Sequence, residues 1–78
     1  MSAASTATDL IDATTAKQIA LRHAQVKDTE ITDYSCETDS GNGVLNYEIE
    51  FACNGCEYEY EINAFTGAIM KFHKELDD

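Results

Sequence analysis

The chain has 78 residues, and its 15 acidic residues against 5 Lys and Arg give a formal net charge of −10. A chain of this length forms one small domain. The charge argues against binding nucleic acid or an anionic membrane surface, because both require Lys and Arg to neutralise phosphates.

Residues 1–10 are mostly small and polar, so we expect a flexible linker or tail there. A single domain is expected over residues 11–74, with a short polar end at residues 75–78. The first residues lack the basic start and apolar segment of a signal peptide. No apolar run is long enough for a membrane helix, so we expect no direct membrane insertion by this chain.

Apolar residues at helical spacing predict one helix over residues 13–25. Asp12 suits the N-cap, because its carboxylate accepts hydrogen bonds from the free amides of the first turn. Leu21 lies off the apolar stripe. His23 lies at its edge, where we expect a partly buried surface residue and no metal ligand. The stripe consists of Ala16, Ile19, Ala20, His23 and Ala24.

A weaker strand is expected over residues 31–38, with Tyr34 and Cys36 on one face. A plain loop follows it at residues 39–43. With residues 40–43 as a four-residue connection, Cys36 lies opposite Tyr47 in the next strand, and Tyr34 opposite Ile49.

Residues 45–62 alternate apolar and acidic side chains on both sides of one Asn-Gly pair. The alternation predicts two strands, each with one buried and one solvent-exposed face. Asn54-Gly55 favours a type I′ turn, because both residues tolerate the positive φ that this turn requires. With these two residues as the loop, the predicted apolar pairs are Cys53–Cys56, Phe51–Tyr58, Ile49–Tyr60 and Tyr47–Ile62.

The same register brings glutamates together on the other face of the hairpin. Glu50 faces Glu59 and Glu48 faces Glu61, and like charges directly across a sheet repel. The simplest interpretation is a solvated acidic surface that keeps the protein soluble. The functional interpretation is a face that binds a cationic partner. The candidate interaction face therefore consists of Glu48, Glu50, Glu57, Glu59 and Glu61.

A turn after the hairpin precedes a fourth strand, which we expect over residues 68–73. This strand places Lys71 opposite Glu59 and His73 opposite Glu57, and so relieves part of the repulsion between carboxylates. Its members on the buried face are Ala68, Met70 and Phe72.

Cys53 and Cys56 form a candidate disulfide or thiol pair at the tip of the hairpin. Redox catalysis is disfavoured, because the catalytic thiol of a Cys-x-x-Cys motif lies at a helix N-terminus, whereas this pair lies among carboxylates. Cys36 is six residues along the sheet from Cys53, or ~20 Å, which exceeds the ~7 Å that a disulfide allows between Cα atoms. Zinc is disfavoured because there is a single closely spaced pair, and we expect no metal and no cofactor.

Together these elements predict an α+β fold, in which one N-terminal helix packs on one face of a 3–4-stranded antiparallel β-meander. No set of nucleophile and base, phosphate-binding loop or metallopeptidase motif is present in the sequence. We therefore expect no enzymatic activity and no catalytic residues. The predicted core consists of Ile19, Ala20, Tyr34, Cys36, Tyr47, Ile49, Phe51, Tyr58, Tyr60, Ile62, Met70 and Phe72.

Several blocks of residues resemble the PepSY domain family, which comprises peptidase propeptide and YpeB-like modules of cystatin-like architecture. Residues 57–69 are similar to the family's signature, a Tyr-Glu-Tyr-Glu-Ile run followed by Thr-Gly, with Asn63 where Asp is usual. The chain departs from the family at Cys53 and Cys56, which are usually not Cys, and at Gln25, where a Gly often ends the helix. The other similar blocks are residues 11–16, 19–24, 47–51 and 54–55, and the resemblance covers about residues 11 to 74.

The resemblance implies a non-catalytic module of secreted or membrane-anchored bacterial proteins. Its expected partner is a protein, with peptidases as the class whose inhibition or regulation has been proposed for the family. It also implies an extracytoplasmic location, with the signal or anchor absent from this chain. Two alternatives stay open: a metal- or redox-responsive domain that uses Cys53 and Cys56, and a ligand-free spacer or dimerisation domain that forms a homodimer.

Overall fold

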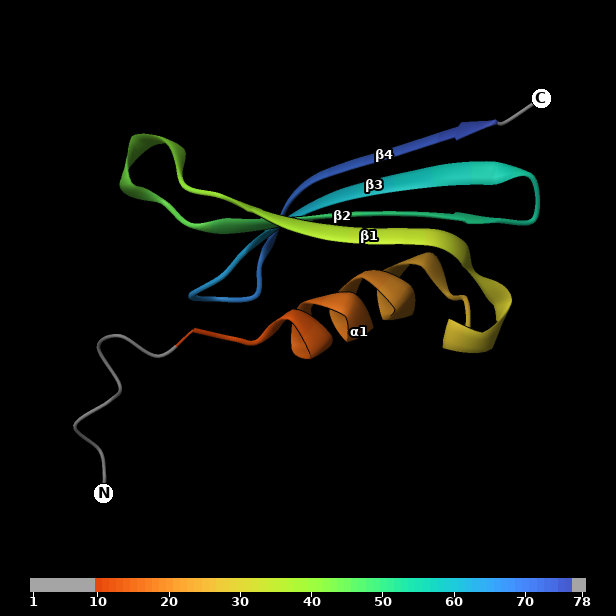
Figure 1. Cartoon of the computed structure of the whole chain (residues 1–78), viewed down its shortest axis with the longest axis horizontal. Helices are drawn as coiled ribbons and strands as arrows, with labels where there is room; N and C mark the ends of the chain where they lie inside the picture. Colours follow the sequence, from red (N-terminus) through yellow and green to blue (C-terminus); the bar gives the residue numbers. More distant parts are fainter. Residues whose placement is uncertain (1–9, 77–78) are drawn as a thin grey trace, which may run out of the picture.

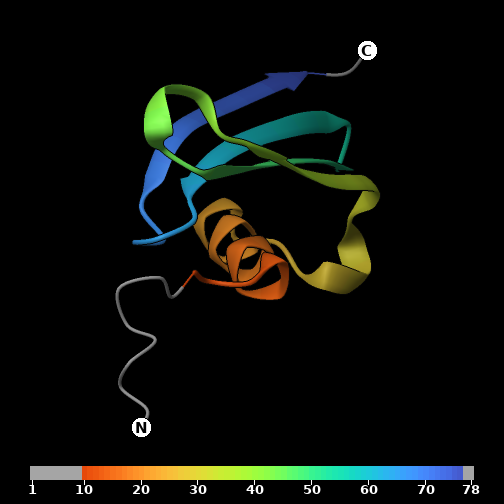
Figure 2. The same cartoon turned by 60° about the vertical axis from the view of Figure 1, so that its left-hand side comes forward.

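The computed structural model of the protein describes residues 10–76, which form one helix and four strands (Figure 1). The strands make a single antiparallel sheet in the order β1-β2-β3-β4, and the helix lies along one face of it (Figures 1 and 2). The predicted α+β meander is therefore confirmed. The predicted linker at residues 1–10 falls almost wholly outside the described residues. The elements are α1 (Ala13–Ala24), β1 (Thr32–Asp39), β2 (Asn46–Cys53), β3 (Cys56–Asn63) and β4 (Ile69–Leu76).

Helix α1 begins and ends close to where its sequence predicts. The carboxylate of Asp12, the N-cap residue, accepts a 2.8 Å hydrogen bond from the amide of Thr15. Gln25 follows the last helical residue in the left-handed conformation, with a φ of 61°. This is the position that Gly most often takes at the end of a helix, so Gln25 occupies it at some conformational cost.

The prediction that Leu21 lies off the buried stripe is wrong, because this side chain is only 4% exposed. Ala16 and Ala20 are fully buried, and their short side chains let the helix lie close to the sheet. Leu21 follows Ala20 and is rotated by ~100° from it around the helix. Because the helix lies close to the sheet, the long side chain of Leu21 also reaches the core. Ile19, which was predicted to be in the core, is half-buried.

The β2–β3 hairpin confirms the predicted register at every pair. Asn54 and Gly55 have φ values of 53° and 77°, as a type I′ turn requires. The structure pairs Cys53 with Cys56, Phe51 with Tyr58, Glu50 with Glu59, Ile49 with Tyr60, Glu48 with Glu61 and Tyr47 with Ile62.

The predicted register of β1 is wrong by two residues, because Cys36 lies opposite Ile49 and not opposite Tyr47. Strand β1 continues to Asp39, and the connection to β2 contains a 3-10 turn at Gly41–Gly43. This connection is longer than the expected four-residue loop. Cys36 is consequently four residues from the position opposite Cys53, or ~13 Å, which is still too far for a disulfide.

The predicted register of β4 is also wrong by two residues. Lys71 lies opposite Glu61, and His73 lies opposite Glu59. Two local features cause the shift: the amide of Asn63 bonds the carbonyl of Ala68 at 2.9 Å to close the turn, and the β3–β4 register is irregular next to Glu61. The strand also runs on to residue 76, into the segment expected to be a polar end.

Two residues of β4 that were predicted to be buried are exposed, which corrects the predicted core. Met70 is 55% exposed and Phe72 is 43% exposed. The reason is that α1 packs mainly against β2, so the last strand of the sheet extends beyond the cover of the helix. The buried apolar residues are Ala16, Ala20, Leu21, Ile49, Phe51, Cys53, Tyr58, Tyr60, Ile62 and Ala64, with Tyr34, Cys36 and Tyr47 half-buried beside them.

Two tyrosine hydroxyls that enter this core find polar partners. The Tyr47 hydroxyl donates to the carbonyl of Ile11 at 2.9 Å. The Tyr60 hydroxyl lies 2.8 Å from Nδ1 of His23, whose ring also makes an edge contact with Phe72. Burial raises the pKa of Tyr60 to about 12. His23 is exposed and not partly buried as expected, although its ring nitrogen lies next to the hydroxyl of the buried Tyr60.

Candidate interaction face

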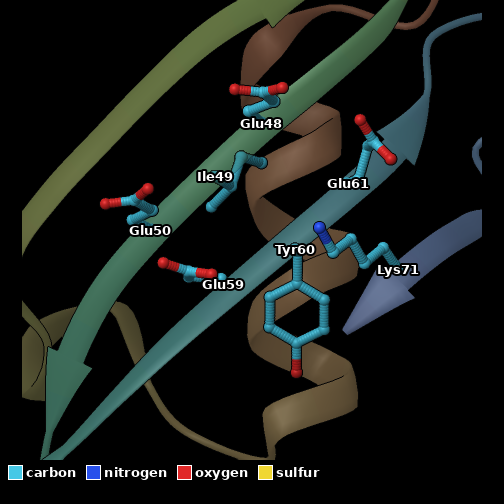
Figure 3. A pocket seen from close by; sticks show the side chains of 7 residues that line it. All are labelled: Glu48, Ile49, Glu50, Glu59, Tyr60, Glu61 and Lys71. Atoms are coloured by element: carbon cyan, nitrogen blue, oxygen red, sulfur yellow. The ribbon is translucent and has the colours of Figure 1, made fainter. Parts of the chain in front are cut away.

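The five candidate glutamates lie on the face of the sheet opposite α1. Glu48 and Glu50 project from β2, and Glu57, Glu59 and Glu61 project from β3, because alternate residues of a strand point to opposite faces. Figure 3 shows four of them together with Lys71. These residues line a hollow of about 130 Å³. The structure therefore places the predicted residues together on one surface.

Three further carboxylates from β1, those of Asp33, Glu37 and Asp39, join this face and were left out of the predicted set. Glu37 lies opposite Glu48. Carboxylate oxygens of Asp39, Glu48 and Glu61 lie within 4.8 Å of one another. The predicted strand ended at residue 38 and so left Asp39 out, although the acidic residues at alternate positions in that strand were a signal for this cluster.

The crowding of carboxylates affects the pKa of Glu48. Partial desolvation raises the pKa of this carboxyl above its usual range, and the negative charges of Asp39, Glu61 and Glu37 raise it further. The ammonium of Lys71 opposes this rise in pKa. Ionised Glu48 thus sits in an unfavourable environment within the folded protein.

Among the described strands, β4 is the one that carries cationic side chains. Lys71 lies opposite Glu61, and His73 lies opposite Glu59. Nε2 of His73 is 3.7 Å from a carboxylate oxygen of Glu75, with both side chains mostly exposed. Exposed pairs of this kind are worth only ~0–1 kcal/mol each, so the face keeps a strong negative potential.

We expect the substitution Glu48→Gln to raise the melting temperature of the domain at pH 7. Because the pKa of Glu48 is higher in the folded than in the unfolded protein, the protonated form favours folding. This contribution is complete below the unfolded pKa and is lost as the pH rises through the folded pKa. Thermal denaturation should therefore show a gain at pH 7 that vanishes near pH 4, and a less stable variant at pH 7 contradicts this electrostatic account.

The two cysteines at the hairpin tip face each other in the structure as free thiols. Cys53 is buried and Cys56 is half-buried. Directly opposed residues of an antiparallel pair have Cα atoms ~4.5–5.5 Å apart, within the range that a disulfide accepts. Neither thiol lies at a helix N-terminus, since the turn between them is the hairpin loop itself.

This arrangement defines a class of protein: a small α+β domain with one acidic sheet face. The family model described as "Peptidase propeptide and YPEB domain" matches residues 10–73. The chain therefore belongs to the PepSY family, whose members are generally non-catalytic modules associated with peptidases and are typically extracytoplasmic. No described helix is long and apolar enough to cross a membrane.

The chain is also similar to a curated protein, the uncharacterized protein Spy1430 of Streptococcus pyogenes serotype M6. The two are 38% identical over 60 residues, which cover 77% of this chain and 46% of that protein. The chain thus spans about half the length of this relative. No solved structure gives a significant match.

Proposed function

We propose that this domain is a protein-interaction module whose acidic sheet face binds a basic segment of a partner, with a peptidase as the partner class. The observation that carries the proposal is the pair of glutamate rows that face each other across β2 and β3. Membership of the PepSY family supports a peptidase as the partner.

The spacing of the glutamates fits an extended basic peptide. Alternate residues of a strand are ~6.6–6.8 Å apart, and this is the spacing from Glu48 to Glu50 and from Glu57 to Glu59. An extended peptide with Lys or Arg at alternate positions repeats its cations at the same distance. Because each exposed ion pair contributes ~0–1 kcal/mol, several must form together, and we expect binding that weakens as salt screens the charges.

A matched pair of variants tests whether the acidic face is the binding surface. The probe is a labelled peptide of alternating Lys and Thr, and its affinity is measured by fluorescence anisotropy at low salt. Replacing Glu50 and Glu59 by Gln should weaken binding by about 3- to 10-fold. The control replaces Asp28 and Glu30 by Asn and Gln, which removes the same charge from the short 3-10 helix Asp28–Glu30 between α1 and β1. Equal losses in the two variants overturn the proposal.

A second assay tests the regulation of peptidases. Purified domain is added to a secreted zinc metallopeptidase, and the rate of peptide hydrolysis is followed. We expect the rate to fall as the domain is added, and to fall less with the Glu50→Gln/Glu59→Gln variant. Absence of binding and of inhibition for a panel of such enzymes rejects peptidases as the partner class.

We also propose that the module works outside the cytoplasm, where Cys53 and Cys56 become a disulfide. Oxygen takes two hydrogens from the two thiols as the S–S bond forms, so the intact mass of protein that was never reduced should be about 2 Da low. After alkylation, only Cys36 should carry a label. Three labelled thiols contradict the disulfide, weaken the extracytoplasmic assignment and make metal binding by the pair the next hypothesis to test.

A further inference from the structure

Strand β4 forms one open edge of the sheet, and its residues differ from those of the opposite edge. It is the last strand in the order β1-β2-β3-β4 (Figure 1), so its outer backbone groups have no neighbouring strand among the described residues. Such an edge is a template for pairing with another strand. Both edge strands contain a register irregularity, β1 between Thr32 and Ser35 and β4 between Ile69 and Lys71, so backbone regularity does not choose between the two edges.

The charges of the two edges also differ. Strand β1 carries only acidic charged residues, namely Asp33, Glu37 and Asp39, so two copies that met through β1 would repel. Strand β4 carries Lys71, His73, Lys74 and Glu75. It is therefore the edge at which one copy of this acidic chain offers both signs of charge to another copy.

We propose that β4 pairs antiparallel with β4 of a second copy of this chain, with His73 at the two-fold axis. A two-fold axis perpendicular to the sheet keeps the faces of both copies aligned, so it pairs residues on the same face. With His73 at the centre, Lys71 lies opposite Glu75 of the second copy. Glu75 in turn lies opposite Lys71, which makes two pairs of opposite charge.

The neighbouring registers are less favourable. Centring the pair on Phe72 places Lys71 against His73 and leaves Glu75 without a cation opposite it. Centring it on Lys74 pairs His73 with Glu75 but places the two Lys74 ammonium groups against each other. The register centred on His73 places the two imidazoles against each other, and it is the one of the three that pairs Lys71 with Glu75.

The exposed apolar side chains independently favour the same register. Leu76 is 81% exposed and Met70 is 55% exposed, the two highest values among the large apolar residues described. With His73 at the axis, Met70 of each copy lies opposite Leu76 of the other. One register therefore satisfies the charges and covers the most exposed apolar residues of the strand.

The resulting dimer has a continuous eight-stranded sheet, since each copy contributes four strands. The axis keeps both helices on one side and both acidic faces on the other. The dimer thus doubles the length of the acidic surface. The proposed dimer does not depend on what the acidic surface binds, because the edge of β4 and the glutamates of β2 and β3 are separate features.

A charge-swap experiment tests both the partner and the register. The variants Lys71→Glu and Glu75→Lys are studied by sedimentation equilibrium, alone and mixed in equal amounts, at protein concentrations up to the millimolar range. We expect the wild type to dimerise, and each variant alone to dimerise at least about tenfold more weakly, because two attractive pairs become repulsive. The mixture should regain dimers, since the carboxylate introduced in one variant then meets the ammonium introduced in the other.

General attraction between the variants does not explain such a recovery, because both keep a large net negative charge. A wild type that stays monomeric, or a mixture that stays as weak as the single variants, overturns the proposal. Leu76→Ser gives a second test that does not depend on charge. Because Leu76 is mostly exposed, this change should leave the circular dichroism of the monomer unaltered and weaken dimerisation severalfold, and unchanged dimerisation contradicts the proposed register.

Discussion

Replacing Ile49 by alanine should remove much of the stability of this domain. Ile49 is fully buried at the centre of β2, where α1 packs against the sheet. Such a truncation costs ~2–5 kcal/mol, through lost burial and the cavity that remains. A domain of this size has only ~4–12 kcal/mol of total stability, so the melting temperature should fall by about 10–30 °C.

Met70→Ala is the matched control for Ile49→Ala, because the sequence predicts both side chains to be in the core. Met70 is 55% exposed, so its truncation should cost less than ~1 kcal/mol. Thermal denaturation followed by circular dichroism measures both variants. Equal losses at the two positions contradict the placement of α1 over β2 and away from β4.

The second large effect is expected for Tyr60→Phe, which removes the hydroxyl that lies 2.8 Å from Nδ1 of His23. Tyr60 is 3% exposed, so its hydroxyl has little access to water, and the loss of this hydrogen bond should cost ~1–2 kcal/mol. Urea unfolding at pH 7 measures the cost. The same substitution in a His23→Ala background should cost less, because the partner is already gone.

Tyr60 also predicts how stability changes at alkaline pH. Its pKa is raised to about 12 by burial, whereas an unfolded tyrosine ionises near ~10. The stabilising contribution is complete below the unfolded pKa and is lost as the pH rises toward the folded pKa. Tyr60→Phe should reduce this alkaline loss. The pKa of Tyr34 is also raised to about 12, so part of the loss of stability at alkaline pH should remain in the variant. If the stability of the variant falls with pH as steeply as that of the wild type, the assignment to Tyr60 is wrong.

The hairpin could be predicted from the sequence in full because two independent signals agree there. Asn54-Gly55 fixes the turn, and a one-residue slip would bury the glutamates and expose the aromatic residues. The outer strands lack such a signal. A shift of two residues keeps every side chain on its correct face, so the apolar pattern alone could not separate the predicted pairing of Cys36 with Tyr47 from the observed pairing with Ile49.

The candidate face was predictable to the same extent as the strands that carry it. The glutamates of β2 and β3 follow from the alternation and the turn, and the structure brings them together as expected. Asp39 was missed because the expected strand ends at residue 38, whereas β1 continues to Asp39. Glu37 could have been included, because the alternation in β1 places it on this face in either register. Phe72 and Met70 were misplaced for another reason: a strand pattern shows which side chains share a face, and the position of the helix decides which of them are covered.

The most direct test of the proposed function is a map of where a basic peptide binds. Isotope-labelled protein is titrated with the alternating Lys-Thr peptide, and the amide chemical shifts are followed by NMR. Binding through the acidic face predicts that the largest shifts cluster on β2 and β3 and disappear at high salt. The residues concerned are Glu48, Glu50, Glu57, Glu59 and Glu61. Shifts that cluster instead on α1, or no shifts at millimolar peptide, contradict the proposal.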